Sequence, residues 1–250
     1  LCALVFLAQI TTPAEVPSLV ERYGMIPARV SDPDNPVEIT VGVQRVMTDR
    51  GVQMVPVKRP AAPSAVQPVL TLLTCVFLHG GWMHFLGNMW FLHIFGDNVE
   101  DRFGHLGYLI FYLGAGVAAS LTHYVSELHS QVPTIGASGA IAGVMGAYFV
   151  SYPKAKVVTL VPLFIILEIL VLPAQVFLGV WFAIQFFQGT LSTSVAATGV
   201  AWWAHIGGFA VGVVIAWLLG RFRLLRSPNE SRLPRTDHIQ MYRIPRTRQL

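Results

Sequence analysis

From residue 69 onward the chain alternates between long apolar stretches and short polar breaks. Because about 20 residues of helix cross a hydrocarbon core of roughly 30 Å, each long apolar stretch predicts a transmembrane helix. The stretches are Thr71–Gly96, Leu106–Val125, Ile135–Tyr152, Val157–Gln188 and Val200–Leu219. The apolar segment Leu1–Ala8 is too short to span a membrane, and we expect it to be the end of a first helix that is truncated in this chain. The pattern therefore predicts an all-α polytopic membrane protein with a bundle of six helices.

One apolar stretch, Val157–Gln188, differs from the others because Pro162, Glu168 and Pro173 interrupt it. Proline removes a hydrogen-bond donor and clashes with the preceding turn of a helix. We therefore expect the first half of this stretch to lie on the membrane surface or to re-enter the membrane. The second half, Ala174–Gln188, is expected to form the core of the span.

The two segments outside the apolar region have different compositions. Residues 9–68 contain nine prolines and nearly balanced charges, which predicts a long extracytoplasmic loop, with a short strand where the residues alternate at Val37–Val43. Residues 221–250 carry eight arginines and only two acids. Basic residues beside a membrane span favour the cytoplasmic side, so these residues predict a basic cytoplasmic tail.

The overall composition excludes a soluble protein. Apolar residues make up 54% of the chain and charged residues 12%, whereas an ordinary soluble domain has about 25% charged residues. The net charge of +4 reflects the basic tail, so it does not indicate a nucleic-acid partner. Two cysteines are too few for a disulfide framework. The composition indicates an integral membrane protein surrounded by a lipid bilayer.

With the truncated segment Leu1–Ala8 counted as the first helix, the second, fourth and sixth predicted helices each open with a group of polar residues. These groups are His79–Asn88, Gly136–Gly139 and Ala204–Gly208. The ends of the same three spans carry lysine or arginine, so the three spans run in one direction and begin near the outer face. Polar groups within a membrane are costly and tend to be functional. We therefore expect the three groups to meet at one depth.

Ser138 and His205 are the strongest candidates for chemistry. A serine in a membrane helix more often packs or bonds its own backbone, and a lone histidine often packs as well. However, residues 136–147 are mostly Gly, Ala and Ser, and the sixth span carries a ridge of small residues beside His205, which favours close approach of the two helices. A histidine that lies within hydrogen-bond distance of the serine hydroxyl can take its proton. Because neither span contains an acid, the pattern predicts a Ser–His dyad.

The second span offers groups that could stabilise an oxyanion. Asn88 carries an amide donor, and His84 lies one helical turn before it on the same face. The N–H groups at the start of the fourth span would add the positive end of a helix dipole. Asn88 could equally form a structural hydrogen bond between helices, and we expect His79 and His93 to be structural.

Other chemistries fit the residues less well. No HExxH motif occurs, although His79, His84 and His205 could still bind a metal together. Asp97 lies at a helix end without the second aspartate that an intramembrane aspartyl protease needs. Glu168 between two prolines is the one hint of a transporter. We therefore expect no metal, no nucleotide and no other cofactor.

Three motifs resemble those of the rhomboid intramembrane serine proteases, over about residues 69–220. The group that contains His79, His84 and Asn88 is similar to the family's HxxxN element. The GASG sequence at 136–139 resembles its GxSG nucleophile motif, and AHIGGFAVG at 204–212 resembles its base-bearing sixth helix. The resemblance implies that Ser138 is the nucleophile, that His205 is the general base, and that Asn88 forms the oxyanion site with help from His84. It also implies a six-helix core, water that reaches the site from outside, and single-pass membrane proteins as substrates.

The chain departs from the family pattern at two points. Many members have a Trp-Arg pair in the first long loop, but the first tryptophan here is Trp82. Some members have an aromatic residue one turn after the serine that packs on the histidine, where this chain has Ala142. The first departure concerns the structure of the loop, and the second concerns how His205 is held.

We therefore predict an intramembrane serine endopeptidase that works through an acyl-enzyme, with a catalytically silent relative that binds and routes membrane proteins as the alternative. The predicted regions are 1–8, the end of helix 1; 9–68, the extracytoplasmic loop; 69–220, the catalytic core; and 221–250, the cytoplasmic tail. The expected location is a bacterial inner membrane. We also expect the fifth span to pack against the second as the movable side of the site, through Phe177 and Trp181.

Overall fold

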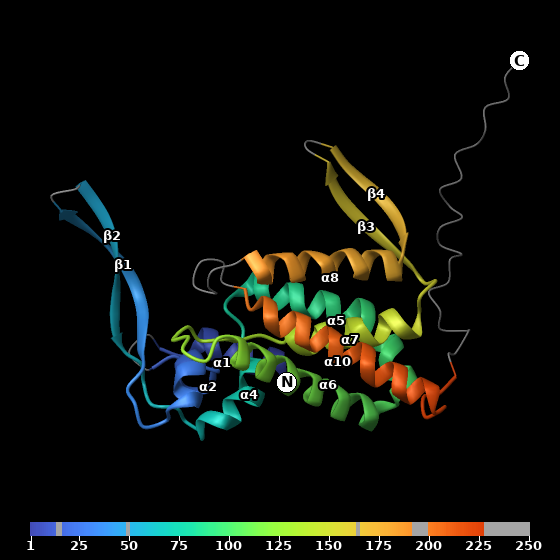
Figure 1. The fold of residues 1–250 in the computed structure, drawn as a ribbon, viewed down its shortest axis with the longest axis horizontal. Helices are drawn as coiled ribbons and strands as arrows, with labels where there is room; N and C mark the ends of the chain where they lie inside the picture. The colour runs from blue at the N-terminus through green and yellow to red at the C-terminus, as the bar shows by residue number, and fades with distance from the viewer. Residues whose placement is uncertain (14–16, 49–50, 164–165, 192–199, 228–250) are drawn as a thin grey trace, which may run out of the picture.

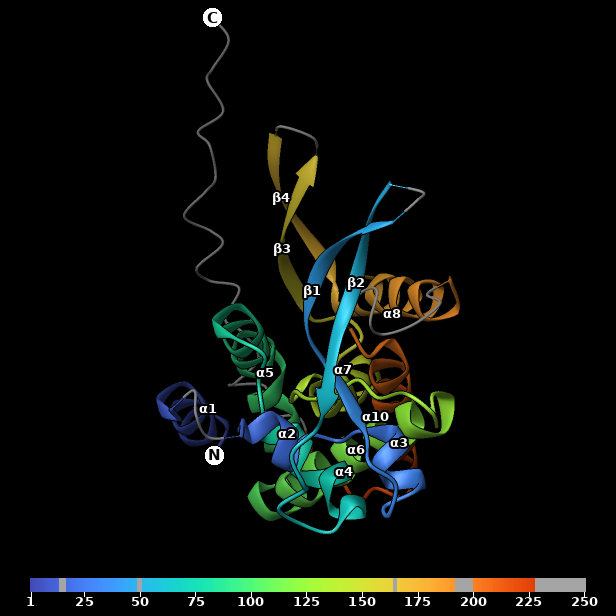
Figure 2. The same ribbon diagram turned by 90° about the vertical axis from the view of Figure 1, so that its left-hand side faces the viewer.

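The computed structural model describes residues 1–13, 17–48, 51–163, 166–191 and 200–227. Five helices, α5, α6, α7, α8 and α10, lie side by side, and two β-hairpins project in the same direction from this bundle (Figures 1 and 2). The longer helices are α1 (Cys2–Thr11), α5 (Trp82–Phe103), α6 (His105–Ser126), α7 (Ser138–Ser151), α8 (Ala174–Leu191) and α10 (Trp202–Arg221). The short ones are α2 (Leu19–Tyr23), α3 (Pro27–Ser31), α4 (Thr71–Thr74) and the 3-10 turns Pro68–Leu70 and Cys75–Phe77.

The predicted helical bundle of a polytopic membrane protein is confirmed. Among the described residues, α6, α8 and α10 are long and apolar enough to cross a membrane. The pair Pro68–Phe77 and Trp82–Phe103 would make a fourth span if both pieces are counted together. Helices α1 and α7 are apolar but shorter, with 10 and 14 residues. The chain is therefore an integral membrane protein with a mostly helical fold.

The apolar stretch Thr71–Gly96 is not one continuous helix, and the helix that we expected to open with the polar group at His79 begins at Trp82. The helix is interrupted between Phe77 and Trp82, and the two helical pieces are at 78° to each other. Gly81 has a φ of +153°, which glycine adopts far more easily than other residues. Helix α5 then runs through the polar residues that follow Gly96 and ends at Gly104, whose φ is +72°. His79 consequently precedes α5 and is not part of it.

Two antiparallel hairpins complete the fold. Strand β1 (Glu38–Thr48) pairs with β2 (Gly51–Pro60), so the predicted strand at Val37–Val43 is present but longer. Strand β3 (Lys156–Leu163) pairs with β4 (Ile166–Pro173), so the segment that we expected to lie on the membrane surface or to re-enter the membrane forms a hairpin. The residues of this second hairpin are mostly valine, leucine and isoleucine, which suit paired strands, and Pro173 ends β4 where α8 begins.

The first hairpin is attached to α2 by a polar network outside the membrane spans. Both terminal guanidinium nitrogens of Arg59 donate to the carboxylate of Glu21, at 3.0 and 2.7 Å. The Ala62 N–H donates to the same carboxylate at 3.0 Å, and Arg29 donates to the backbone carbonyl of Glu21 at 2.7 Å. The hydrogen bonds from Arg59 hold the pKa of the Glu21 carboxyl below its ordinary value. The network fixes the base of the hairpin against the loop.

The core of the bundle is formed by α7, most of which is buried between α6 and α10. Small residues allow this contact, because a Cβ at Gly212 of α10 would overlap the Gly143 carbonyl oxygen. A Cβ at Gly208 would overlap the Gly139 carbonyl oxygen. Close backbone approach of this kind is typical of membrane helices that pack through small residues. The starts of α7 and α10 are therefore held close together.

We expect Gly212→Ala to destabilise the protein by about 1–3 kcal/mol, the usual cost of overpacking a close contact. The added methyl group would meet backbone atoms of Gly143, which cannot rotate away. Gly220→Ala is the matched control on the same helix, because nothing lies within 4 Å of its added Cβ. Thermal unfolding in detergent measures both variants. Equal melting temperatures for the two would contradict the close packing of α7 and α10.

Candidate active site

The side chains of Ser138 and His205 are joined by a hydrogen bond. Ser138 is the first residue of α7, and His205 lies in the first turn of α10. The distance between Ser138 Oγ and His205 Nε2 is 2.8 Å, although 67 positions separate the residues in sequence. Both residues are half-buried. A hydroxyl at this distance can donate its proton to the imidazole, which is the arrangement that a serine nucleophile needs.

The backbone around Ser138 explains why the hydroxyl lies beside His205. Gly136 has a φ of +122°, and its N–H donates to the Cys75 carbonyl at 2.9 Å. This turn places the start of α7 against the segment before α5. On the other side of Ser138, a Cβ at Gly139 would lie 2.7 Å from Ala119 Cβ and 3.7 Å from Ala204 Cβ. The absence of a side chain at Gly139 therefore allows α7 to approach α6 at Ala119, while α7 stays in ordinary van der Waals contact with Ala204, one residue before His205.

His84 belongs to α5, and its side chain lies beside Gly136, just before the start of α7. Its Nδ1 accepts a hydrogen bond from the Gly80 N–H at 3.3 Å. A Cβ on Gly136 would lie 2.6 Å from His84 Nε2 and 3.7 Å from Ser138 Oγ, so Gly136 lies between the two side chains. The predicted polar groups of the second, fourth and sixth spans therefore meet at these residues.

Asn88 lies one turn after His84 on α5 and is buried, with 7% of its surface exposed. Its side-chain nitrogen has no hydrogen-bond partner among the described residues. Leaving a buried donor unpaired costs about 1–3 kcal/mol, so such a group in a native structure calls for an explanation. An acceptor supplied by a bound substrate would satisfy it.

Two residues of α8, Gln185 and Trp181, contact His205, and neither contact was predicted. The Nδ1 atom of His205 is 2.7 Å from the Gln185 side-chain oxygen. The Trp181 ring lies 5.9 Å from the imidazole, between ring centroids, and the Trp202 ring lies edge-on at 6.3 Å. The polar Gln185, which lies among apolar neighbours one turn after Trp181, was the signal that could have identified this contact.

Of the other predicted residues, His79 is buried and surrounded by aromatic rings. Phe6, His84 and Phe85 all contact its ring, with centroids between 5.3 and 6.2 Å. The backbone of His79 exchanges two hydrogen bonds with the Gln9 side chain, both at 2.9 Å, which connects α1 to this segment. Within the described part of the chain, no group of three or more His, Cys, Asp or Glu side chains could hold a metal. His93 is exposed.

The fifth span contacts the second, but the two predicted aromatic residues behave differently. The Phe177 ring stacks on Phe95 of α5, with centroids 6.3 Å apart. The Trp181 ring instead lies against His205 and Phe209 of α10, at 5.9 and 6.0 Å. The expectation that both residues contact the second span therefore holds for Phe177, whereas Trp181 faces the dyad.

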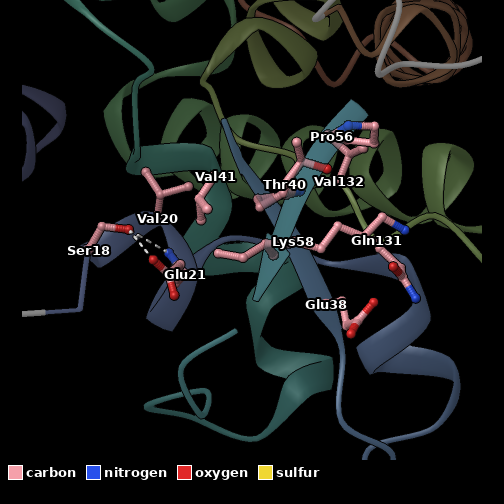
Figure 3. A pocket seen from close by; sticks show the side chains of 12 residues that line it. Ser18, Val20, Glu21, Glu38, Thr40, Val41, Pro56, Lys58, Gln131 and Val132 are labelled. Atoms are coloured by element: carbon pink, nitrogen blue, oxygen red, sulfur yellow. Dashed lines mark hydrogen bonds between the residues drawn. The ribbon is translucent and has the colours of Figure 1, made fainter. Parts of the chain in front are cut away.

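Two hollows lie near this region. A cavity of about 20 Å³ is lined by Ser138 and by residues of α6 and α10, including Ser120 and Ala204. A larger hollow of about 780 Å³ lies between α2, the first hairpin and the segment that leads into α7 (Figure 3). Glu38, Lys58 and Gln131 are among the residues that line it. The residues that line the larger hollow include neither Ser138 nor His205.

Comparison with known proteins agrees with these observations. Rhomboid-like protein 11, chloroplastic, of Arabidopsis thaliana is 34% identical over 156 residues, which cover 60% of this chain and 52% of that protein. Rhomboid protein 1, mitochondrial, of Saccharomyces cerevisiae is 26% identical, over 61% of this chain and 42% of that protein. Rhomboid protease GluP of Bacillus subtilis is 41% identical over 76 residues, 30% of this chain and 14% of that protein.

The matched regions span about half or less of these relatives. The relatives come from plants and yeast as well as from a bacterium, so a bacterial inner membrane stays an expectation for this chain. The model of the Rhomboid domain matches residues 67–222, which contain α5 to α10 together with Ser138 and His205. With this match over more than half of its length, the chain belongs to the rhomboid family.

Proposed function

We propose that this protein is an intramembrane serine endopeptidase that cleaves single-pass membrane proteins. The observation that carries the proposal is the 2.8 Å hydrogen bond between Ser138 Oγ and His205 Nε2. Membership in a family whose named members include a protease supports it. The proposal assigns the role of nucleophile to Ser138 and that of general base to His205.

The reaction follows from the two side chains. His205 Nε2 takes the hydroxyl proton as Ser138 Oγ attacks the carbonyl carbon of the scissile peptide bond. The resulting tetrahedral intermediate collapses when the C–N bond breaks, and the imidazolium gives its proton to the leaving amine. Water then attacks the acyl-enzyme, again with His205 as the base, and releases the second product and the free serine.

The negative charge on the intermediate needs hydrogen-bond donors. The unpaired side-chain nitrogen of Asn88 is one candidate, and His84, which lies beside Gly136, is a second. The backbone N–H groups at the start of α7 supply the positive end of a helix dipole beside Ser138. In this proposal, Asn88 is the main oxyanion donor and His84 assists it.

The experiment that tests the proposal is a cleavage assay with purified protein in liposomes that also contain a single-pass membrane protein. We expect the substrate to be cut in or near its membrane span, with no added metal or nucleotide. EDTA should leave the rate unchanged. A lack of cleavage for a panel of such substrates, or a loss with EDTA that zinc restores, would contradict the proposal. Binding of substrates without cleavage would favour a silent relative that routes membrane proteins.

Lateral access of the substrate gives a separate prediction for Phe177. Its ring fills the contact with Phe95 on α5, so Phe177→Val should loosen the two helices and lower the melting temperature. We expect cleavage of a membrane-embedded substrate to be kept or raised, and cleavage of a soluble, loosely structured peptide to change much less. Phe187→Val on the exposed side of α8 is the matched control. A fall in both activities in proportion to lost stability would mean that this contact only stabilises the fold and has no role in substrate entry.

A further inference from the structure

We propose that Gln185 of α8 is a positioning residue for His205, which fixes the tautomer and orientation of the imidazole and so ties the base to α8. This inference rests on the proposed serine-protease function. Neither α7 nor α10 contains an acid, and Gln185 takes the place that an acid would hold in a catalytic triad.

The geometry places the two ring nitrogens of His205 between partners on two other helices. Nε2 faces Ser138 Oγ of α7 at 2.8 Å, and Nδ1 faces Gln185 Oε1 of α8 at 2.7 Å. Both distances are within the range of a good hydrogen bond. Gln185 is 6% exposed, and a polar side chain in so buried a position on an apolar helix needs a partner. The imidazole is therefore held at both nitrogens.

These contacts select one tautomer of the neutral imidazole. The oxygen of Gln185 can only accept, so Nδ1 must carry the proton. The unprotonated nitrogen is then Nε2, which can accept the hydroxyl proton of Ser138. In the other tautomer, Nε2 would carry a proton and could not act as the base. The hydrogen bond from Nδ1 to Gln185 therefore favours the reactive form, as the third group does in triads.

Trp181 gives the ring a second contact from the same helix. It lies one turn before Gln185, and its ring is 5.9 Å from the imidazole with the planes inclined by 37°. Ala142, one turn after Ser138, has no aromatic ring to offer. The aromatic contact with the imidazole thus comes from Trp181 of α8, while Ala142 of α7 offers none.

A purely structural role for Gln185, as a link between α8 and α10, makes a different prediction. It would change the stability of the protein and leave the activity of the folded fraction unaltered. The distinction therefore needs a rate measured on folded protein, together with a variant that keeps the accepting oxygen.

The experiment compares Gln185→Met, which has similar length and no accepting oxygen, with Gln185→Glu, which keeps an acceptor. Gln188→Met, on the exposed side of α8, is the matched control. The measured quantities are kcat and KM for a soluble peptide, the rate of labelling of Ser138 by a fluorophosphonate, and the melting temperature. We expect Gln185→Met to lower kcat and the labelling rate about tenfold with little change in KM, as the loss of one hydrogen bond predicts. Gln185→Glu should keep most of both rates.

An unchanged labelling rate per folded molecule in Gln185→Met would overturn the inference, and so would an equal loss in Gln185→Glu. If Gln185→Met does not fold, the Gln185→Glu variant and Trp181→Leu decide the matter. We expect Trp181→Leu to lower the labelling rate and Trp181→Phe to restore part of it. Failure of the wild-type protein to be labelled or to cleave would instead refute the proposed function, so the two outcomes are distinguishable.

Discussion

Ser138→Ala and His205→Ala are each expected to remove detectable proteolysis and to leave the protein folded in detergent. Loss of the nucleophile or of its base typically lowers kcat by about 10⁴–10⁶. The fold should survive because the contact between α7 and α10 depends on glycine backbone, for example at Gly208, and not on the dyad. Cleavage of a reconstituted membrane substrate and thermal unfolding together measure the two effects.

Matched controls are present in the same chain. Ser126→Ala removes an exposed hydroxyl at the end of α6, and His93→Ala removes an exposed imidazole from α5. Both controls should keep wild-type activity. Residual cleavage above about a tenth of the wild-type rate in either dyad variant would contradict the dyad, since that loss is far smaller than a missing nucleophile or base produces.

Asn88→Ala is expected to lower kcat by about 10²–10³, with a smaller effect on KM, as the loss of one oxyanion donor does in other hydrolases. The Asn88 side-chain nitrogen is buried and unpaired among the described residues, so its removal should cost little stability in the absence of substrate. Steady-state kinetics on a soluble peptide and thermal unfolding measure both effects. His84→Ala should have a similar but milder effect.

Asn98→Ala serves as the control for Asn88→Ala because it lies near the other end of α5. The hydrogen bond of Asn98 with Tyr152 uses its backbone carbonyl and is therefore retained in the variant. Full activity of Asn88→Ala would remove Asn88 from the mechanism. An unfolded Asn88→Ala variant would make Asn88 a structural residue, in agreement with the alternative that its sequence context leaves open.

The sequence predicts much of the bundle because membrane helices are defined mainly by the length of their apolar segments. The predicted span Leu106–Val125 corresponds closely to α6, and Val200–Leu219 corresponds to α10. The proximity of Ser138 to His205 could also be expected, because basic residues at the ends of the spans indicate which helices run in the same direction. The catalytic roles of the two residues stay predictions until the variants above are measured.

Other features depend on information that apolar periodicity does not contain. The bend before α5 depends on the conformation of Gly81, and no charged residue interrupts the apolar stretch at that point. The hairpin of β3 and β4 could not be told from a buried helix by its apolar run, because only strand pairing distinguishes the two. The contact of Gln185 with His205 requires the placement of α8 against α10, which no local pattern specifies.

The most direct test of the central claim is the site of fluorophosphonate labelling, read by mass spectrometry of peptides from the purified protein. The reagent reacts with a serine that a neighbouring base has activated. We predict an adduct on Ser138 in the wild-type protein and none in His205→Ala, with both proteins folded. An adduct on a different serine, or labelling of Ser138 that His205→Ala leaves undiminished, would contradict the claim that His205 activates Ser138.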